Sequence, residues 1–412
     1  MIVQRVEKHL IKQNNPFYPM LCDFTHKAKN LYNHTNFLVR DKFIKNDKWL
    51  RYGKLDKILK ADLEFDDYRQ MPTAQSAQQT LRLLEKDWKS FFTSIKDWSK
   101  NKDKYSGRPK LPKYKPKDGK HILILTNQNV KLKKDNVLYF PKTFCGFTVK
   151  PRFAGLDNFV SFRQVRFIPD YKSFTVELVY SIEIPDTALS DNGRYLGIDI
   201  GLDNLAAVVN NAGLKPVVIN GKGLKSINKY YNKKISHYRE TAKRMNNKDY
   251  TNRMDALTRK RNCRMEDYMH KASRYLIEYA RSNHFNTIVI GNNKEWKQES
   301  SMSKKVNQSF VGIPHMKFIE MVQYKAQNAG LNVILTEESY TSGTSFLDNE
   351  QPVKENYNKS RGKERGLFIS NRGIKINADV NGAYQIMKKV FPNVSADGIE
   401  GVALHPVRVS VA

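Results

Sequence analysis

The order of apolar and polar positions divides the chain into segments of different periodicity. Residues 2–12 alternate between apolar and polar, as in a half-buried strand, and Pro16 and Pro19 then end the alternation. From about residue 21 to residue 103, apolar residues recur at steps of three and four, which is the period of helices packed on a core. We therefore expect one strand, followed by a helical segment over residues 17–105.

Short strand-like runs replace the helical period after a cluster of Pro, Gly and Lys residues. Between residues 121 and 188 several alternating runs are separated by turn residues, a pattern typical of a small barrel or sandwich. We predict a β-barrel built from residues 1–16 and 106–190. The helical segment would be inserted into this barrel after its first strand.

A third pattern begins at Arg194 and combines hairpins with strand–helix–strand units. It favours one α/β sheet with mixed strand directions, so the predicted fold class is multidomain α+β. The expected parts are an α/β domain over 191–339 with a helical insertion at about 224–283, a loop over 340–375, and a last segment over 376–412 that begins a helix.

The charge of the chain indicates the kind of partner it binds. The 412 residues include 71 Lys and Arg against 41 Asp and Glu, a formal net charge of +30. Neutralising nucleic-acid phosphates is the commonest use of so large an excess, although a merely solvated basic surface is the alternative. We expect a polyanionic partner.

Several classes of protein are disfavoured by what the sequence lacks. Cys22, Cys145 and Cys263 form no CxxC pair, which argues against a disulfide framework and a cysteine zinc site. The N-terminus carries charges within its apolar run, and nowhere do about 18 apolar residues stand together, so neither a signal peptide nor a membrane partner is expected. Phosphate-loop motifs are absent, which disfavours a nucleotide-driven enzyme. We expect a cytoplasmic protein.

Four acids are the candidates for chemistry. Asp199 lies in the apolar stretch "GIDIG", where a buried carboxylate is costly unless a metal ion binds it. Asp379 lies near a helix start, where the helix dipole alone would favour it. Glu337 and Glu338 follow the strand-like run "LNVILT". Carboxylates that converge from different elements can hold two Mg²⁺ ions for phosphodiester hydrolysis, and hard oxygen ligands select Mg²⁺ or Mn²⁺ over zinc.

These motifs, taken in order, resemble one family. The segments are "AQQTLRLLEKDWKSFF", "GRPKLPKYK", "GIDIGLDNLAAVV", "TIVIGNN", "EMVQYKAQNAGLNVILTEESYTS" and "NADVNGAYQIMKKVF". Together they resemble TnpB (the OrfB family), the RNA-guided nucleases of bacterial insertion sequences that are related to type V CRISPR effectors. The resemblance covers nearly the whole chain and is most specific in the C-terminal half and the "GRPK" loop.

The resemblance implies a fold, partners and a site. The fold would be a wedge-like β-barrel with an inserted helical recognition domain, followed by a RuvC nuclease domain of RNase H-like fold. The partners would be a guide RNA from the element's end and double-stranded target DNA. The guide would read the target by base pairing next to a short flanking motif. The protein would lie in a prokaryotic cytoplasm, and at the nucleoid when it is bound to DNA. Asp199, a Glu and Asp379 would bind Mg²⁺, or Mn²⁺, for cleavage.

The sequence departs from the family at one catalytic position. Most members end the middle strand with Glu, but here "TIVIGNN" has Gly291. Either the protein is a nuclease-inactive RNA-guided DNA-binding repressor, or the carboxylate has moved to Glu337 or Glu338 on the next strand. Glycine would leave room for such a side chain to cross, and both other acids remain, so we favour relocation. Alternate strand residues face opposite ways, and we expect Glu338 to be the ligand, with Glu295 a weaker candidate.

A second departure concerns zinc. The family commonly carries a four-cysteine zinc ribbon after a "TS" dipeptide, but here the loop from Tyr340 to Gly373 offers Ser345, Asp348 and Ser370 and no cysteine. By the resemblance, residues 340–375 would form a target nucleic-acid-binding loop, here without the zinc cysteines. We therefore expect no zinc, and the loop must be ordered by other contacts or by nucleic acid.

Basic residues of the "GRPK" loop and the helical insertion are expected to contact phosphates, although solvated helix faces are the alternative. They are Arg108, Lys110, Lys113, Lys115, Lys233, Lys234, Arg239, Lys243, Arg244, Arg259, Lys260, Arg261 and Arg264. Gln75 and Gln79, one helical turn apart, are candidates for reading the flanking motif, because Gln can pair with adenine. The histidines His237, His270 and His315 are expected to pack or to contact phosphate.

A third functional hypothesis is a DNA transposase that itself joins strands. The long basic architecture and the precedent of the family weaken this hypothesis. The oligomeric state, the guide sequence, the flanking motif and the cut positions stay open.

Overall fold

The computed structural model describes residues 1–46, 48–62, 64–185, 189–292, 312–364, 366–395 and 405–411. Its chain forms two compact units, Met1–Glu183 and Ile184–Ala412. Glu295 lies outside the described residues. Among the described helices, none combines the length and the apolar character needed to cross a membrane.

The N-terminal unit contains two antiparallel sheets. The larger has the order β1 (Ile2–Lys12), β7 (Ser173–Glu183), β6 (Phe159–Asp170) and β2 (Leu123–Thr126), and the smaller has β3 (Lys131–Leu132), β4 (Leu138–Tyr139) and β5 (Thr148–Val149). The strand-like runs of the sequence are therefore strands. Within the described residues, backbone hydrogen bonds do not join them into one closed barrel, so the expected barrel or sandwich is seen as two sheets.

Three helices follow β1 in the N-terminal unit: α1 (Tyr18–Asn46), α2 (Tyr52–Ala61) and α3 (Ala74–Lys100). A capping box between Thr73 and Ser76 starts α3. Its apolar positions face the core, where Trp88 is fully buried and its indole N–H donates to Asn36 of α1 at 3.1 Å. Because β1 pairs with β7 along its length, these helices are inserted between strands of one sheet.

The C-terminal unit is built on a six-stranded sheet. Its order is β12 (Asn332–Thr336), β11 (Thr287–Gly291), β8 (Tyr195–Asp199), β9 (Asn204–Asn210), β10 (Val217–Asn220) and β16 (Val407–Val409). Strands β8, β9 and β10 run antiparallel to one another, whereas β11 and β12 run parallel to β8. The predicted mixture of strand directions is confirmed.

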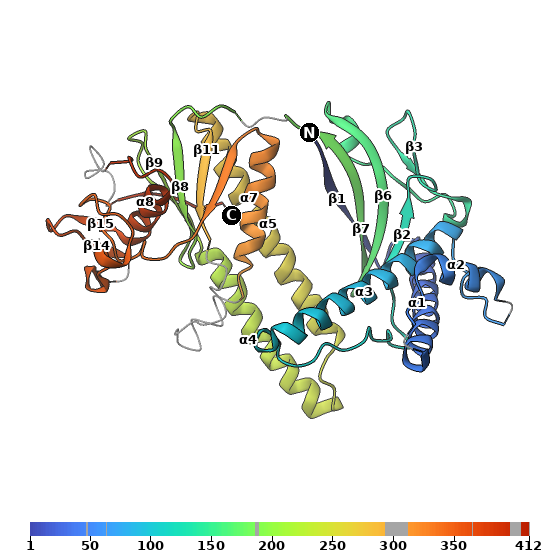
Figure 1. Ribbon diagram of the computed structural model, residues 1–412. Coiled ribbons are helices and arrows are strands. Elements are labelled where there is room, and N and C mark those ends of the chain that lie inside the picture. Colours follow the sequence, from blue (N-terminus) through green and yellow to red (C-terminus); the bar gives the residue numbers. More distant parts are fainter. Residues whose placement is uncertain are drawn as a thin grey trace. The chain divides into compact units, whose positions relative to one another are not determined.

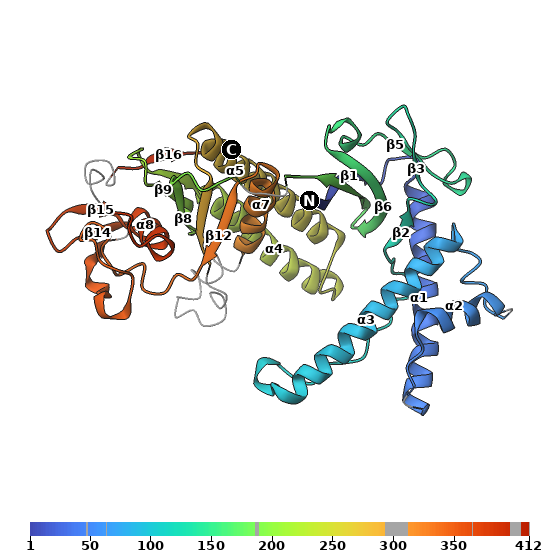
Figure 2. The ribbon, with the colours of Figure 1, turned by 45° about the horizontal axis from the view of Figure 1, so that its top comes forward.

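Helices cover both faces of this sheet (Figures 1 and 2). The helices α4 (Lys222–Asn246), α5 (Asn252–Ser282) and α7 (His315–Asn328) lie on one face, and α8 (Ala378–Val390) lies on the other. Leu196 and Ile198 of β8 pack with Phe318 of α7 in the first core. Val209 of β9 packs with Tyr384 of α8 in the second.

The segment between β12 and α8 packs on the outer side of α8. It contains a small antiparallel sheet of β13 (Gly362–Glu364), β14 (Leu367–Ile369) and β15 (Lys375–Asn377). Phe346 stacks on Tyr384 with ring centroids 4.5 Å apart, and Phe368 joins the same core. The segment thereby shares its core with the helix that carries Asp379.

Candidate active site and nucleic-acid interface

Asp199 lies at the end of β8 and faces α8. Side chains alternate along a strand, so Leu196 and Ile198 enter the core on the α7 side while Asp199 points to the opposite face. A Cβ atom at Gly382 of α8 would lie only 2.7 Å from Asp199 Oδ2. The absence of a side chain at residue 382 therefore lets the helix approach this carboxylate.

Asp379 reaches the same region from the first turn of α8. The side chain of Asn377 caps the helix by accepting from the backbone N–H groups of Asp379 and Val380. The amide of Asn204, at the start of β9, donates to Asp379 Oδ2 at 2.6 Å. Asn204 is only 7% exposed, so it fixes the direction of this carboxylate from within the fold.

Glu338 takes the space above Gly291. Strands β11 and β12 are parallel neighbours with Gly291 opposite Thr336, which places Glu338 two residues past that pair. A Cβ atom at residue 291 would lie 2.5 Å from Glu338 Oε1 and 2.6 Å from Ile386 Cδ1. The Glu338 carboxylate therefore occupies volume that any side chain at residue 291 would need.

Glu337 points away from this cluster. Its carboxylate is exposed, accepts from the backbone N–H of Ser339 at 2.7 Å and pairs with Lys389 at 3.1 Å. The structure thus brings Asp199, Glu338 and Asp379 to one region of the sheet, and it leaves Glu337 in solvent.

Burial and neighbouring negative charges raise the pKa values of two acids in this cluster. Burial, followed by the charges of Glu338 and Asp379, raises the pKa of Asp199 well above its usual range. Burial and the charge of Glu337 raise the pKa of Glu338 to about 7, and the charge of Lys389 opposes that shift. Repelling carboxylates of this kind are typical of sites that bind cations or act as acids and bases.

Two buried oxygen atoms in this region are available for a ligand. Glu338 Oε1 and Asn204 Oδ1 are buried, and neither has a hydrogen-bond partner in the described part of the chain. With the carboxylates they form an all-oxygen set, which suits Mg²⁺ or Mn²⁺. Yet among the described residues no group of three or more Asp, Glu, His or Cys side chains is already arranged to hold a metal ion. The donor chemistry fits, but the ligands are not preassembled.

Asn204 was missed by sequence reasoning. The sequence contains one indication of its role: Asn204 begins the apolar run "NLAAVV", and a polar side chain buried there needs a hydrogen-bond partner. Which distant carboxylate it meets depends on how β9 and α8 pack, and no local pattern carries that information.

The loop expected to lack zinc is held by ion pairs. Arg361 binds Glu350 through two contacts of 2.5 and 2.8 Å, and Asn371 bridges the two residues at 2.8 and 3.0 Å. Asp348, one of the predicted positions, accepts from the backbone N–H of Asn371 at 2.7 Å. The backbone of Ser345 donates to Glu350 at 2.8 Å. Contacts within the protein therefore order this segment.

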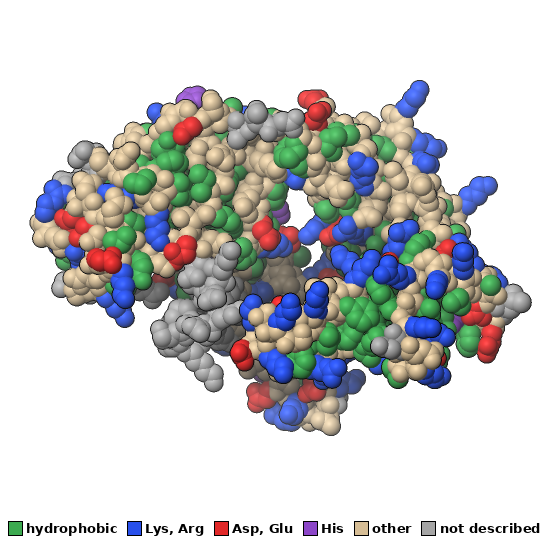
Figure 3. Space-filling view, viewed as in Figure 1, with side chains coloured by type: hydrophobic (Ala, Val, Ile, Leu, Met, Phe, Trp, Pro, Cys, Tyr) green, Lys and Arg blue, Asp and Glu red, His purple; other side chains and the backbone are tan. Residues whose placement is uncertain are grey.

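The "GRPK" loop is fixed by α1. Asn33 exchanges two hydrogen bonds with the backbone of Lys115, at 2.8 and 2.9 Å. Arg108, Lys110 and Lys113 are exposed, whereas Lys115 is half-buried over the Tyr32 ring at 4.8 Å. A cavity of about 530 Å³ lies between the loop and α3. In Figure 3, Lys and Arg side chains gather along α3 on the face in view.

The cations of the helical insertion differ in their environment. Lys233 and Arg239 on α4 are exposed, and Arg259 on α5 is half-buried. Arg261 is used inside the fold, because its guanidinium donates to Asn228 Oδ1 at 2.9 Å and to the carbonyl of Gly312.

Gln75, a candidate for reading the flanking motif, already has a hydrogen-bond partner within the protein, since its side-chain oxygen accepts from the hydroxyl of Thr126. Gln79 is half-buried on the same helix. Of the histidines, His237 and His270 are exposed, and His315 is buried at the start of α7.

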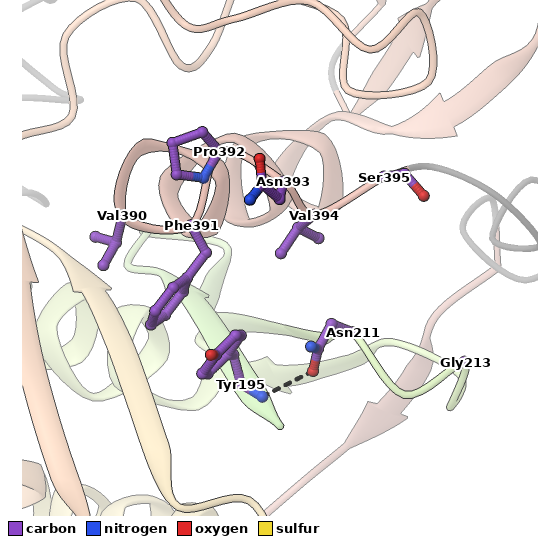
Figure 4. A pocket seen from close by; sticks show the side chains of 9 residues that line it. All are labelled: Tyr195, Asn211, Gly213, Val390, Phe391, Pro392, Asn393, Val394 and Ser395. Carbon is purple, nitrogen blue, oxygen red and sulfur yellow. Dashed lines mark hydrogen bonds between the residues drawn. The ribbon is translucent and has the colours of Figure 1, made fainter. Parts of the chain in front are cut away.

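A separate pocket of about 440 Å³ lies at the opposite end of β8 from Asp199 (Figure 4). Tyr195 stacks on Phe391 there with centroids 3.6 Å apart, and its backbone N–H donates to Asn211 at 2.7 Å. None of the four candidate acids lines this pocket.

Comparison with known proteins gives two family matches. Residues 178–297 match the model OrfB_IS605, described as a probable transposase, and residues 315–386 match the model of the Cas12f1-like TNB domain. No curated protein matches the chain.

Two solved structures are similar over most of the chain. One is a cryo-EM structure of a Cas12f1–sgRNA–target DNA complex, with 15% identity, a TM-score of 0.37, and coverage of 93% of this chain and 98% of that chain. The other is a cryo-EM structure of a CRISPR–Cas12f ternary complex, with 13% identity, a TM-score of 0.37, and coverage of 89% and 80%. The two family matches, over residues 178–297 and 315–386, support a TnpB-like protein and confirm the resemblance drawn from its motifs.

Proposed function

We propose that this chain is an RNA-guided, Mg²⁺-dependent DNA endonuclease of the TnpB type, which cuts target DNA next to a short flanking motif. In this proposal Glu338 replaces the carboxylate that is missing at Gly291. One observation carries the proposal: the Glu338 carboxylate fills the volume that a side chain at residue 291 would occupy. The buried, unpartnered Oε1 atom of Glu338 further supports it, because such an oxygen needs a ligand.

Asp199, Glu338 and Asp379 would hold the metal. When bound, Mg²⁺ would supply an activated water and stabilise the leaving oxygen. The protein would keep the three carboxylates close together in a half-buried site, where the hydrogen bond from Asn204 orients Asp379. Since ligating carboxylates must be deprotonated, the raised pKa of Asp199 means that metal binding and proton release are coupled.

RNA and DNA are proposed as partners on two grounds. The family matches include the OrfB and Cas12f1-like models, and the net charge of +30 calls for a polyanion. Exposed cations on α4 and on the "GRPK" loop would contact phosphates without reading sequence.

Cleavage by matched variants tests the proposal. The full chain is purified with its RNA, the RNA is sequenced, and a plasmid carrying the matched target with a randomised flank is incubated with Mg²⁺. We expect cleavage by the wild type and by Glu337→Gln, and no cleavage by Glu338→Gln, which should still bind the plasmid. Cleavage by Glu338→Gln at the wild-type rate would refute the relocated glutamate.

The nuclease-inactive repressor is the second candidate function. It is favoured by one observation: within the described residues no acidic group is preassembled to hold a metal ion. If the wild-type complex binds the matched plasmid and never nicks it in Mg²⁺ or Mn²⁺, the repressor replaces the endonuclease.

A further inference from the structure

Cys22 and Lys120 form a pair of nucleophilic side chains inside the N-terminal unit. The ammonium group of Lys120 donates to Cys22 Sγ at 3.0 Å, although the two residues are 98 positions apart in the chain. Cys22 lies on α1, and Lys120 comes shortly before β2. Neither residue belongs to the candidate active site, so the proposed endonuclease does not explain their contact.

Two aromatic rings hold the Lys120 side chain in place. Its Nζ atom lies 5.2 Å from the centroid of the Tyr18 ring and 5.1 Å from the centroid of the Phe174 ring. The two rings pack on each other with centroids 5.3 Å apart. A cation that is attracted to two rings has lost part of its freedom before any reaction, so the nitrogen stays near the sulfur.

The chain just before β2 is also fixed on α1 by its backbone. The backbone N–H of His121 donates to the carbonyl of Thr25 at 2.9 Å. His121 directly follows Lys120, and Thr25 lies about one helical turn after Cys22. The nitrogen and the sulfur therefore meet in the folded chain without any rearrangement of the backbone.

The environment of Cys22 favours the form of its side chain that reacts with oxidants. A peroxide oxidises the thiolate and not the thiol, and an adjacent cation stabilises the thiolate. Although burial opposes it, the hydrogen bond to Cys22 raises the pKa of Lys120, so Lys120 stays a cation beside the sulfur. Cys22 is half-buried, and a molecule as small as hydrogen peroxide can still reach it.

We propose that Cys22 and Lys120 form a peroxide-sensitive cross-linking site, at which oxidation joins Sγ to Nζ in a sulfenamide bond. In the first step the Cys22 thiolate attacks hydrogen peroxide and the O–O bond breaks. Sulfur loses two electrons, the peroxide oxygens gain them, and the products are a sulfenic acid and a hydroxide ion. In the second step Nζ bonds to sulfur in place of the hydroxyl group. The departing hydroxyl group and the hydroxide ion each take one proton from the ammonium group, so two water molecules are formed.

The new bond would change the stability of the N-terminal unit. It closes a loop that contains α2 and α3, and closing a long loop stabilises a fold by restricting the unfolded chain. It also removes the positive charge of Lys120. This inference does not depend on the proposed endonuclease, because every group in it lies in the N-terminal unit.

Mass spectrometry of the oxidised protein tests the proposal. The full-length chain is purified under reducing conditions, freed of reductant, treated with hydrogen peroxide and digested. We expect a linked pair of peptides that contain Cys22 and Lys120 and weigh two hydrogen atoms less than their sum. A thiol reductant should restore the separate peptides. Cys145 and Cys263 are exposed and serve as internal controls, because among the described residues no lysine donates to either sulfur.

Matched variants separate the cross-link from a merely structural hydrogen bond. Lys120→Arg keeps a cation beside the sulfur, but a guanidinium group stays protonated and cannot form the bond. We expect this variant to form the sulfenic acid, which a dimedone probe labels, and to give no linked peptide. Cys22→Ser should give neither the label at residue 22 nor the linked peptide.

Thermal unfolding measures the consequence. Peroxide should raise the unfolding temperature of the N-terminal unit by about 10 °C in the wild type and leave that of Cys22→Ser unchanged. A wild type without the linked peptide, at a peroxide concentration that oxidises Cys145 or Cys263, would overturn the proposal. The same linked peptide in similar yield with other lysines would overturn the assignment to Lys120. A link that retains an oxygen atom would overturn the direct bond between sulfur and nitrogen.

Discussion

The space at residue 291 couples two neighbouring strands. Glu338 approaches the site only because Gly291 has no side chain, and its Oε1 atom lies where a Cβ atom would clash. In the proposed relocation, a carboxylate would move to the neighbouring strand end and still reach the same region, because residue 291 leaves the space that its side chain occupies.

Gly291→Ala tests this exchange. The added methyl group would lie 2.5 Å from Glu338 Oε1 and 2.6 Å from Ile386 Cδ1, so both must move. We expect the free energy of unfolding to fall by about 1–3 kcal/mol and plasmid cleavage to be lost. Gly362→Ala is the matched control, because the nearest atom to its new Cβ is 3.8 Å away. Equal stability and equal cleavage in the two variants would contradict the steric argument.

His121 gives the N-terminal unit a dependence on pH. It is 9% exposed and packs on the Tyr32 ring at 4.6 Å, and burial together with the charge of Lys115 lowers its pKa from 6.5 to about 4. Between these values the unfolded chain binds a proton that the folded chain does not, so acid favours unfolding. We expect about 2 kcal/mol of stability to be lost between about pH 7 and pH 5.

Urea unfolding at both pH values measures this loss. His121→Phe cannot bind the proton, so its stability should fall less over the same interval. The control is His237→Gln at an exposed histidine, which should keep the wild-type dependence. An unchanged dependence in His121→Phe would assign the effect to other groups.

At the scale of elements, local periodicity predicted individual strands and helices, but it did not predict which strands pair. The alternation over residues 2–12 and the steps of three and four in "LRLLEKDWKSFF" predicted β1 and α3, because each pattern depends on a single buried face. The sequence did not predict the division of the strands into two sheets, or the small sheet of β13, β14 and β15. These depend on which distant strands meet, as when β1 pairs with β7.

In the candidate site, too, the sequence predicted local features and did not predict contacts between distant segments. The alternation expected to continue past the run "LNVILT" indicated that only one of Glu337 and Glu338 would face the other acids. Strand β12 ends at Thr336, and Glu338 is the residue that lies with them. Two contacts depend on long-range packing: the hydrogen bond from Asn204 to Asp379 and the hydrogen bond from Arg261 to Asn228. Residue type and spacing could not reveal them.

One of the ion pairs in the segment between β12 and α8 is largely buried. Glu350 and Arg361 are 15% and 12% exposed, and although burial opposes it, hydrogen bonds from Arg361 keep the pKa of Glu350 below its usual range. Glu350→Gln would leave Arg361 buried without its counter-charge. We expect the C-terminal unit to lose about 3 kcal/mol of stability in chemical denaturation.

The control for this prediction is Glu355→Gln, at an exposed residue of the same segment, which should unfold as the wild type does. Because protein contacts hold the segment, adding a chelator to the wild type in a buffer without Mg²⁺ or Mn²⁺ should leave its unfolding midpoint unchanged. A shifted midpoint would show that a bound metal also contributes.

At the scale of the whole molecule, the net charge of +30 does not say which cations meet a nucleic acid. The structure separates them by environment. Arg239 is exposed on α4, whereas the guanidinium of Arg261 is held by Asn228 and the carbonyl of Gly312. Two arginines of the same helical hairpin should therefore contribute to different properties.

Salt dependence distinguishes the two arginines. The affinity for a random duplex falls with salt in proportion to the number of phosphates neutralised, so Arg239→Ala should lower the slope of log K against log salt by about 1. Arg261→Ala should leave that slope unchanged and reduce the free energy of unfolding, because Asn228 and Gly312 would lose their donor. Anisotropy titrations across a salt series and urea unfolding measure the two effects. If Arg261→Ala lowers the slope and Arg239→Ala does not, the internal hydrogen bonds of Arg261 do not persist when nucleic acid binds, and exposure is the wrong criterion for choosing the phosphate contacts of this helical pair.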